Sequence, residues 1–157
     1  MKFIFTMHQN DIADSVIEAM ARLISETFGE QYPEPNFPER VRTKSHPMVI
    51  LAKNANEVVG FKLGYERWQG TFFSWLGCVR PEYRRQGIAR ELLQRQHQWC
   101  EEQGYEKILT NSRNSFPKMM ILNIQEGFQI SGTEMDGGDP PPTILFSKLL
   151  NDDSQKR

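Results

Sequence analysis

The chain has 157 residues, a length typical of one domain with a single hydrophobic core. Hydrophobic residues make up 38% of it and charged residues 25%, a balance that favours a folded chain over a disordered one. Nineteen basic residues against twenty acidic ones give a formal net charge of -1, which excludes the broad basic surface of a nucleic-acid-binding protein. We therefore expect one domain over residues 1–150 and a flexible C-terminal tail over residues 151–157.

The cysteines, the histidines and the lengths of the apolar runs indicate the cellular compartment and whether the protein binds a metal or a membrane. Cys78 falls in a strand-like run and Cys100 on a helix-like face, so both are interpreted as core thiols. His8, His46 and His97 lack paired ligand spacing, so we expect no metal site. No secretory signal is visible, and no eighteen apolar residues follow one another. These features predict a cytoplasmic protein with no nucleic-acid or membrane partner.

The first expected elements are a strand and an amphipathic helix. Apolar residues alternate over residues 3–7, which predicts the strand. Asn10 or Asp11 is expected to cap the helix, and Gly29 to end it. Apolar residues of the helix recur at three- and four-residue spacing: Ala13, Val16, Ile17, Met20, Leu23, Ile24 and Phe28.

A proline-rich stretch, residues 31–47, separates this helix from three expected strands. Its prolines discourage regular structure, so we expect a loop with room for one short helical turn. Residues 48–52 and 58–65 are apolar, partly β-branched runs joined by a short polar segment, which predicts a hairpin. A third strand is expected over residues 72–79.

Two further helices are expected in the second half. The first is indicated by Ile88, Leu92 and Trp99 on one face and ends near Gly104, and a short strand over residues 108–110 follows. The second is expected to be largely buried because apolar residues cover much of its circumference. Those residues are Met119, Met120, Ile121, Leu122 and Ile124, between a cap at Asn114 or Ser115 and a stop at Gly127. With two last strands over residues 128–133 and 143–149, the order predicts an α+β or α/β layout in which helices cover a central sheet.

The most informative segment, residues 75–89, runs from a buried strand through a short turn into a helix. At a helix start the first amides lack intrahelical partners and the helix dipole adds positive potential, so a phosphate can accept several backbone hydrogen bonds there. Gly87 permits close approach, small Ala89 lets the helix lie near the strand, and Arg84 and Arg85 add cationic donors. The segment predicts a phosphate loop, and it lacks the glycine patterns of nucleoside triphosphate and dinucleotide sites.

This segment resembles the signature of the GNAT acetyltransferases, in which an apolar strand and a Val-x-Pro-x-Tyr turn precede Gln/Arg-x-x-Gly-x-Gly/Ala. The matching residues are Val79, Pro81, Tyr83, Arg84, Gly87 and Ala89. A Gly127-Phe128 pair, which ends many GNAT motifs, extends the resemblance over residues 48–149. The resemblance implies a single-domain α/β fold with a central mixed, mostly antiparallel sheet flanked by helices. It also implies an N-acetyltransferase that uses acetyl-CoA.

The resemblance assigns cofactor-binding positions as well. In this family the strand before the signature bonds the pantetheine arm through its backbone, at positions matched by Gly77, Cys78 and Val79. The pyrophosphate lies among the positions matched by Arg84, Arg85, Gln86, Gly87, Ile88 and Ala89. A purely structural interpretation stays open for both groups, as core strand residues and a solvated helix entry.

Two asparagines, Asn114 and Asn123, look like cofactor-facing positions of the family. Asn114 is equally well interpreted as a helix cap. Asn123 lies four residues before Gly127, where many members carry a tyrosine thought to protonate the leaving thiolate. Because an amide is not an acid, Asn123 is expected to hydrogen-bond the cofactor arm or the sulfur region instead.

The expected reaction is direct attack of a neutral amine on the thioester carbonyl in a ternary complex. A carboxylate that removes the amine proton would help; Glu66 is the candidate, Glu30 and Asp136 are alternatives, and a solvated glutamate is the competing interpretation. The acceptor is expected to be a primary amine of a small molecule, peptide or protein, in a pocket shaped by residues 33–47 and 135–142. Acidic residues suggest a cationic acceptor: Glu26, Glu30, Glu34, Asp136 and Asp139.

Other functions stay open at this point. A non-catalytic acyl-CoA-binding regulatory module would keep the cofactor pocket but lack turnover, consistent with Asn123 in place of the tyrosine. A different nucleotide-binding domain would bind ATP or a dinucleotide in place of CoA. The resemblance also allows a homodimer.

Overall fold

A computed structural model describes residues 2–135 and 142–150. The predicted tail over residues 151–157 lies outside this part, as do Asp136 and Asp139. The elements in chain order are β1 (Ile4–Gln9), α1 (Asp14–Phe28), α2 (Phe37–Arg42), β2 (Met48–Asn54), β3 (Glu57–Trp68), β4 (Thr71–Val79), a 3₁₀ turn (Pro81–Tyr83), α3 (Ile88–Glu102), β5 (Lys107–Arg113), α4 (Pro117–Gln125), β6 (Gln129–Glu134) and β7 (Thr143–Leu149).

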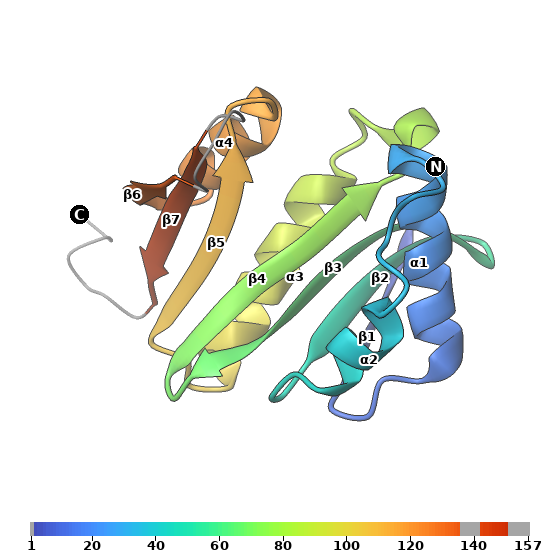
Figure 1. Cartoon of the computed structure of the whole chain (residues 1–157), viewed down its shortest axis with the longest axis horizontal. Helices are drawn as coiled ribbons and strands as arrows, with labels where there is room; N and C mark the ends of the chain where they lie inside the picture. Colours follow the sequence, from blue (N-terminus) through green and yellow to red (C-terminus); the bar gives the residue numbers. More distant parts are fainter. Residues whose placement is uncertain (1, 136–141, 151–157) are drawn as a thin grey trace.

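The strands of the described chain form one seven-stranded sheet in the order β1-β2-β3-β4-β5-β7-β6. Only β4 and β5 pair in parallel among them, and every other neighbouring pair is antiparallel. Helix α3 supplies the crossover that a parallel pair requires, and it lies across the sheet in Figure 1. The expectation of a mixed, mostly antiparallel sheet flanked by helices is confirmed.

The parallel pair β4 and β5 stays together along only part of its length. Its register runs from Thr71 opposite Lys107 to Ser74 opposite Thr110 and then stops, although both strands continue. Figure 1 shows the strands diverging toward their arrowheads. We call the unpaired lengths, residues 75–79 of β4 and 111–113 of β5, the splay. Its consequence is that the β5-facing backbone groups of β4 are left without a strand partner over those residues.

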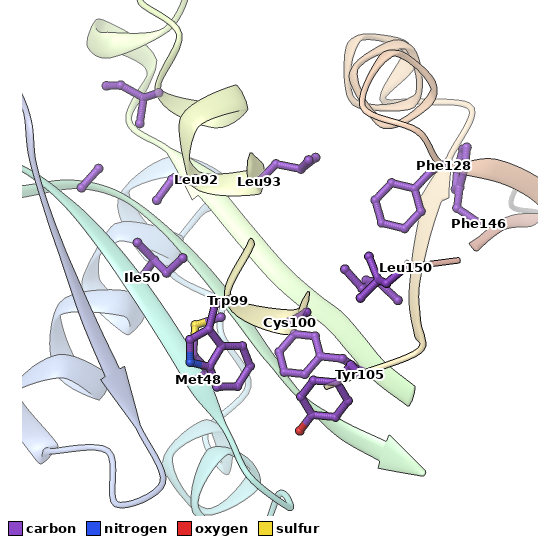
Figure 2. Close-up of a cluster of buried hydrophobic side chains, with 14 of the residues drawn as sticks. Met48, Ile50, Leu92, Leu93, Trp99, Cys100, Tyr105, Phe128, Phe146 and Leu150 are labelled. Carbon is purple, nitrogen blue, oxygen red and sulfur yellow. The ribbon is translucent and has the colours of Figure 1, made fainter. Parts of the chain in front are cut away.

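Two hydrophobic clusters cover the two faces of the sheet. One packs α1 and α2 against β2 and β3, with Met20 and Val41 fully buried. The other packs α3 against the opposite face and includes Leu92, Leu93 and Trp99 (Figure 2). Burying one leucine side chain contributes about 1.5–3 kcal/mol, so α3 is held firmly in place behind the splay.

Several sequence predictions about the helices were wrong. Neither Asn10 nor Asp11 caps α1, whose N-cap is Ala13 without a side-chain bond. The N-cap of α4 is Phe116, so neither Asn114 nor Ser115 caps that helix.

Helix α4 was expected to be largely buried, and this was also wrong. Ile121 and Ile124 are 55% and 51% exposed, and Asn123 is the one buried residue of the helix. The physical reason is that α4 packs mainly against β5 and β6 of the sheet, so one side of the helix finds packing partners and the rest faces outward.

Candidate functional site

The turn between β4 and α3 has the backbone shape that the sequence predicts. Arg85 and Gly87 adopt positive φ values of 63° and 81°, and Gly87 is the N-cap of α3 without a side-chain cap. Left-handed backbone is readily adopted by glycine, which explains why the helix can begin abruptly there. Within the described residues, no backbone carbonyl accepts a hydrogen bond from the amides of residues 86–89. These free amides and the helix dipole together form a site for an anion.

Open space lies in front of these amides. A Cβ added at Gly87 would meet no heavy atom within 4 Å. A shallow hollow of about 180 Å³ adjoins the position, lined by Phe3, Phe5, Gln86, Gly87, Ile88 and Glu91. The carboxylate of Glu91 is held by Arg95, whose Nε donates to its Oε1 at 2.8 Å. Free donors beside an open space fit a phosphate group.

The arginines around this turn differ in what they bind. Arg84 is exposed and its Nε donates to the carbonyl oxygen of Val79 at 3.3 Å, while Arg85 is exposed at the turn. Arg80, by contrast, is engaged by Glu26 at 2.6 Å and by Glu57 at 3.6 Å. The two exposed guanidinium groups therefore add positive charge next to the free amides.

The middle of the splay is formed by Gly77, which is exposed. The side chain of Lys62 from β3 lies over it: a Cβ added at Gly77 would be 3.2 Å from Lys62 Cδ and 3.6 Å from Lys62 Nζ. Cys78 points to the other face, where its Sγ donates to Thr27 Oγ1 at 3.3 Å and burial raises the pKa of the thiol. Both Cys78 and Cys100 are free and buried, as the sequence predicts.

A group of buried polar atoms lies between α3, α4 and β7. Lys148 Nζ donates to the carbonyl oxygen of Glu126 at 2.9 Å and to Nδ1 of His97 at 3.0 Å. Burial, followed by the positive charges of Lys148 and Lys62, lowers the pKa of His97 to about 3, so the ring is neutral. Among the described residues, His97 Nε2 and Asn123 Oδ1 are buried without a hydrogen-bond partner. An orphaned buried polar group costs about 1–3 kcal/mol, which a bound ligand or water can offset.

Comparison with known proteins decides the family. Residues 17–117 match the sequence model of the Acetyltransferase (GNAT) family, which is more than half of the chain. The chain belongs to the GNAT family. This GNAT protein is therefore an acyltransferase, and acetyl-CoA is its acyl donor. No curated protein matches it in sequence.

Solved GNAT structures share its fold at low sequence identity. The ribosomal-protein-S18-alanine N-acetyltransferase from Escherichia coli superposes with a TM-score of 0.77 at 15% identity, covering 95% of this chain and 96% of that one. A GNAT acetyltransferase from Elizabethkingia anophelis with acetyl-CoA bound gives 0.70 at 19%, covering 93% and 98%. An aminoglycoside 6'-N-acetyltransferase complexed with coenzyme A gives 0.77 at 15%, covering 93% and 96%. Such identities show the fold. In the described part of this GNAT chain, no helix is long and apolar enough to cross a membrane.

The remaining residues singled out in the GNAT sequence lie apart from the α3 start. Asn114 is exposed in the turn after β5. Glu66 pairs with Phe72 of β4, at the opposite end of that strand from the splay. Its Oε2 is 3.2 Å from Nδ1 of His46, and a side-chain hydrogen bond joins it to Tyr105. Burial, then the charge of Glu66, raises the pKa of Tyr105 to about 12.

Sequence reasoning missed three polar residues of this GNAT fold: Lys62, His97 as a buried ring, and Lys148. A lysine within the apolar run of β3 was a visible signal, since the residues on either side of it, Phe61 and Leu63, are core residues. The pairing of His97 with Lys148 joins distant parts of the chain, and no local pattern announces it.

Proposed function

We propose that this protein transfers the acetyl group of acetyl-CoA to a primary amine by direct attack in a ternary complex. The observation that carries the proposal is that the unpaired backbone of β4 in the splay leads along the chain to the free amides at the start of α3. Acetyl-CoA has the matching order of groups, an amide-containing arm followed by a pyrophosphate. Acetyl-CoA supplies an activated thioester, and the protein supplies position and hydrogen bonds.

The proposed binding residues divide into two groups. The amides of Gln86, Gly87, Ile88 and Ala89, with the side chains of Arg84 and Arg85, hold the pyrophosphate. The backbone of Gly77, Cys78 and Val79 bonds the pantetheine arm, and Asn123 offers its unpartnered Oδ1 to the same arm. Asn114, which is exposed in the turn after β5 and does not cap α4, is assigned a contact with the cofactor in this proposal.

Removal of the amine proton is assigned to Glu66 in this proposal, acting through water. Its carboxylate is tied to His46 and Tyr105, and its side chain is 26% exposed, so it remains accessible to solvent. Because Glu66 lies beyond the end of the splay along β4, a water molecule is assigned to carry the proton from the amine to its carboxylate.

The sheet face opposite α3 supports a proposal about the acceptor. Trp75, in the splay, is joined there by Tyr65, and Lys44 lies over both rings at 5.0 Å and 4.6 Å. Arg40 lies over Trp75 as well, at 5.1 Å. Cations gathered on an aromatic platform favour an acceptor that carries a carboxylate or another anion beside its amine.

The acidic residues that suggested a cationic acceptor are partly engaged elsewhere. Glu26 pairs with Arg80 and Glu34 with Arg40. Competition between amino acids or acidic peptides and polyamines as acceptors tests which charge the site prefers. A cytoplasmic location fits two buried free thiols and stays part of the proposal. The homodimer stays a prediction.

Thermal shift and thiol release test the proposal together. Acetyl-CoA and CoA are expected to raise the melting temperature, and a panel of amines is expected to contain one that releases free CoA thiol. Binding without release by any acceptor would favour the non-catalytic module. Stabilisation by ATP or a dinucleotide but not by CoA would contradict the assignment of the site.

A further inference from the structure

Lys62 carries a cationic side chain at a position where no described residue provides an anionic partner. It lies in β3 between Ile50 of β2 and Gly77 of β4, on the face that α3 covers. Within the part of the chain that the structure describes, it forms no hydrogen bond and no ion pair. The residue is only partly exposed, whereas a lysine placed for stability would be paired or would extend fully into solvent.

The groups around Lys62 raise the free-energy cost of its positive charge. Its neighbours in the sheet, Ile50 and Gly77, are apolar. On α3 it interacts electrostatically with His97, whose ring is neutral. On its other side His97 accepts a hydrogen bond from Lys148 of β7, and the positive charges of Lys148 and Lys62 both disfavour protonation of its ring. Burial alone lowers the pKa of Lys62 to about 8, and no described carboxylate counters it. A costly unpaired charge of this kind is typical of functional sites.

We propose that Lys62 is the proton donor to the sulfur of CoA as the thiolate leaves, at the point of the splay marked by Gly77. The inference rests on the proposed function, since it needs the acyl donor to lie along β4. Its geometric basis is that Lys62 Nζ lies over the exposed strand residue in the middle of the splay. Asn123 cannot act as an acid, so the position where many members carry a tyrosine supplies no proton here, and Lys62 takes that role in the proposal.

The step balances as follows. The amine forms a bond to the acetyl carbon, the carbon–sulfur bond breaks, and the electron pair of that bond goes to sulfur. The ammonium of Lys62 gives one proton to sulfur and becomes a neutral amine. The proton lost by the attacking nitrogen passes through water to Glu66 and on to solvent, which reprotonates Lys62, so that the products are an N-acetyl amine and CoA thiol. An acid with a pKa of about 8 is well matched to a thiol, whose ordinary pKa is about 8.5.

Calorimetry with CoA and with desulfo-CoA, which lacks the sulfur, tests the contact without turnover. The wild type is expected to bind CoA more tightly than desulfo-CoA at pH 8, where about half of the Lys62 side chains carry a proton and the thiol begins to ionise. Lys62→Met should abolish this preference while leaving desulfo-CoA binding unchanged, and Lys62→Arg should retain it. Lys53→Met, a half-buried lysine of β2 away from the splay, serves as the control.

Turnover provides the second measurement. Lys62→Met is expected to lower kcat by about 100-fold while the KM for acetyl-CoA changes little. Equal affinity of the wild type for CoA and desulfo-CoA would overturn the inference, as would a Lys62→Met variant that keeps the wild-type preference. If the wild type bound neither ligand, the cofactor site itself would be refuted, and the inference with it.

Discussion

Replacing Lys62 by methionine is expected to stabilise the fold near neutral pH. The pKa of Lys62 is about 8 in the folded protein, against an ordinary value of 10.5. That difference corresponds to a cost of about 3 kcal/mol when both states carry the proton, below pH 8. Since the side chain can relax toward solvent, we expect Lys62→Met to raise the free energy of unfolding by about 1–3 kcal/mol at pH 7.

The sign of the pH dependence gives a sharper test. The folded state binds this proton more weakly than the unfolded chain does, so the wild type gains stability as pH rises from 8 to 10.5. The advantage of the methionine variant should therefore shrink across that window and largely vanish above it. Urea unfolding of both proteins at pH 7 and pH 10.5, with Lys53→Met as control, measures it. An advantage that is equal at the two pH values, or a loss of stability at pH 7, would refute the reasoning.

The remaining predictions concern acid stability and the packing of two helices. His97 has its pKa lowered to about 3, so folding excludes a proton that the unfolded chain binds below about pH 6.5, and stability should fall as pH drops from there. Urea curves between pH 7 and pH 4.5 should show this decline, and His97→Gln should flatten it; a parallel decline in both proteins would count against a neutral buried ring. Leu92 of α3 is 1% exposed, so Leu92→Ala is expected to cost about 2–5 kcal/mol. Ile121 of α4 is 55% exposed, so Ile121→Ala should change stability by less than about 0.5 kcal/mol, and a similar loss in both variants would mean that α4 is covered in solution.

What the sequence predicted well depends on neighbours in the chain. The helix periodicity of α3, the hairpin of β2 and β3, and the left-handed glycine before Ile88 are local features with local causes. Gly87 is the clearest case, since its left-handed backbone follows from the tight turn between a strand and a helix.

What the sequence did not predict depends on contacts between distant segments. The exposure of Ile121 and Ile124 follows from how much of α4 meets the sheet, which apolar periodicity cannot tell. The end of β4–β5 pairing at Ser74 and Thr110 is likewise a property of two strands that separate in space. For Lys62, the strand pattern was visible, but its position over Gly77 appears only in the fold.

The central claim is that the free amides at the start of α3 hold the pyrophosphate of acetyl-CoA. Gly87 and Gly104 form a matched pair at the two ends of this helix, with φ values of 81° and 87° and no heavy atom within 4 Å of an added Cβ. Gly87→Glu and Gly104→Glu should therefore lose similar stability, while only the former places a carboxylate against the phosphates.

Calorimetric titration of acetyl-CoA into the wild type and these two variants is the most direct measurement. The account predicts that Gly104→Glu binds like the wild type and that Gly87→Glu loses at least about 100-fold in affinity, because like charges repel strongly at contact distance. Wild-type affinity in Gly87→Glu would contradict it.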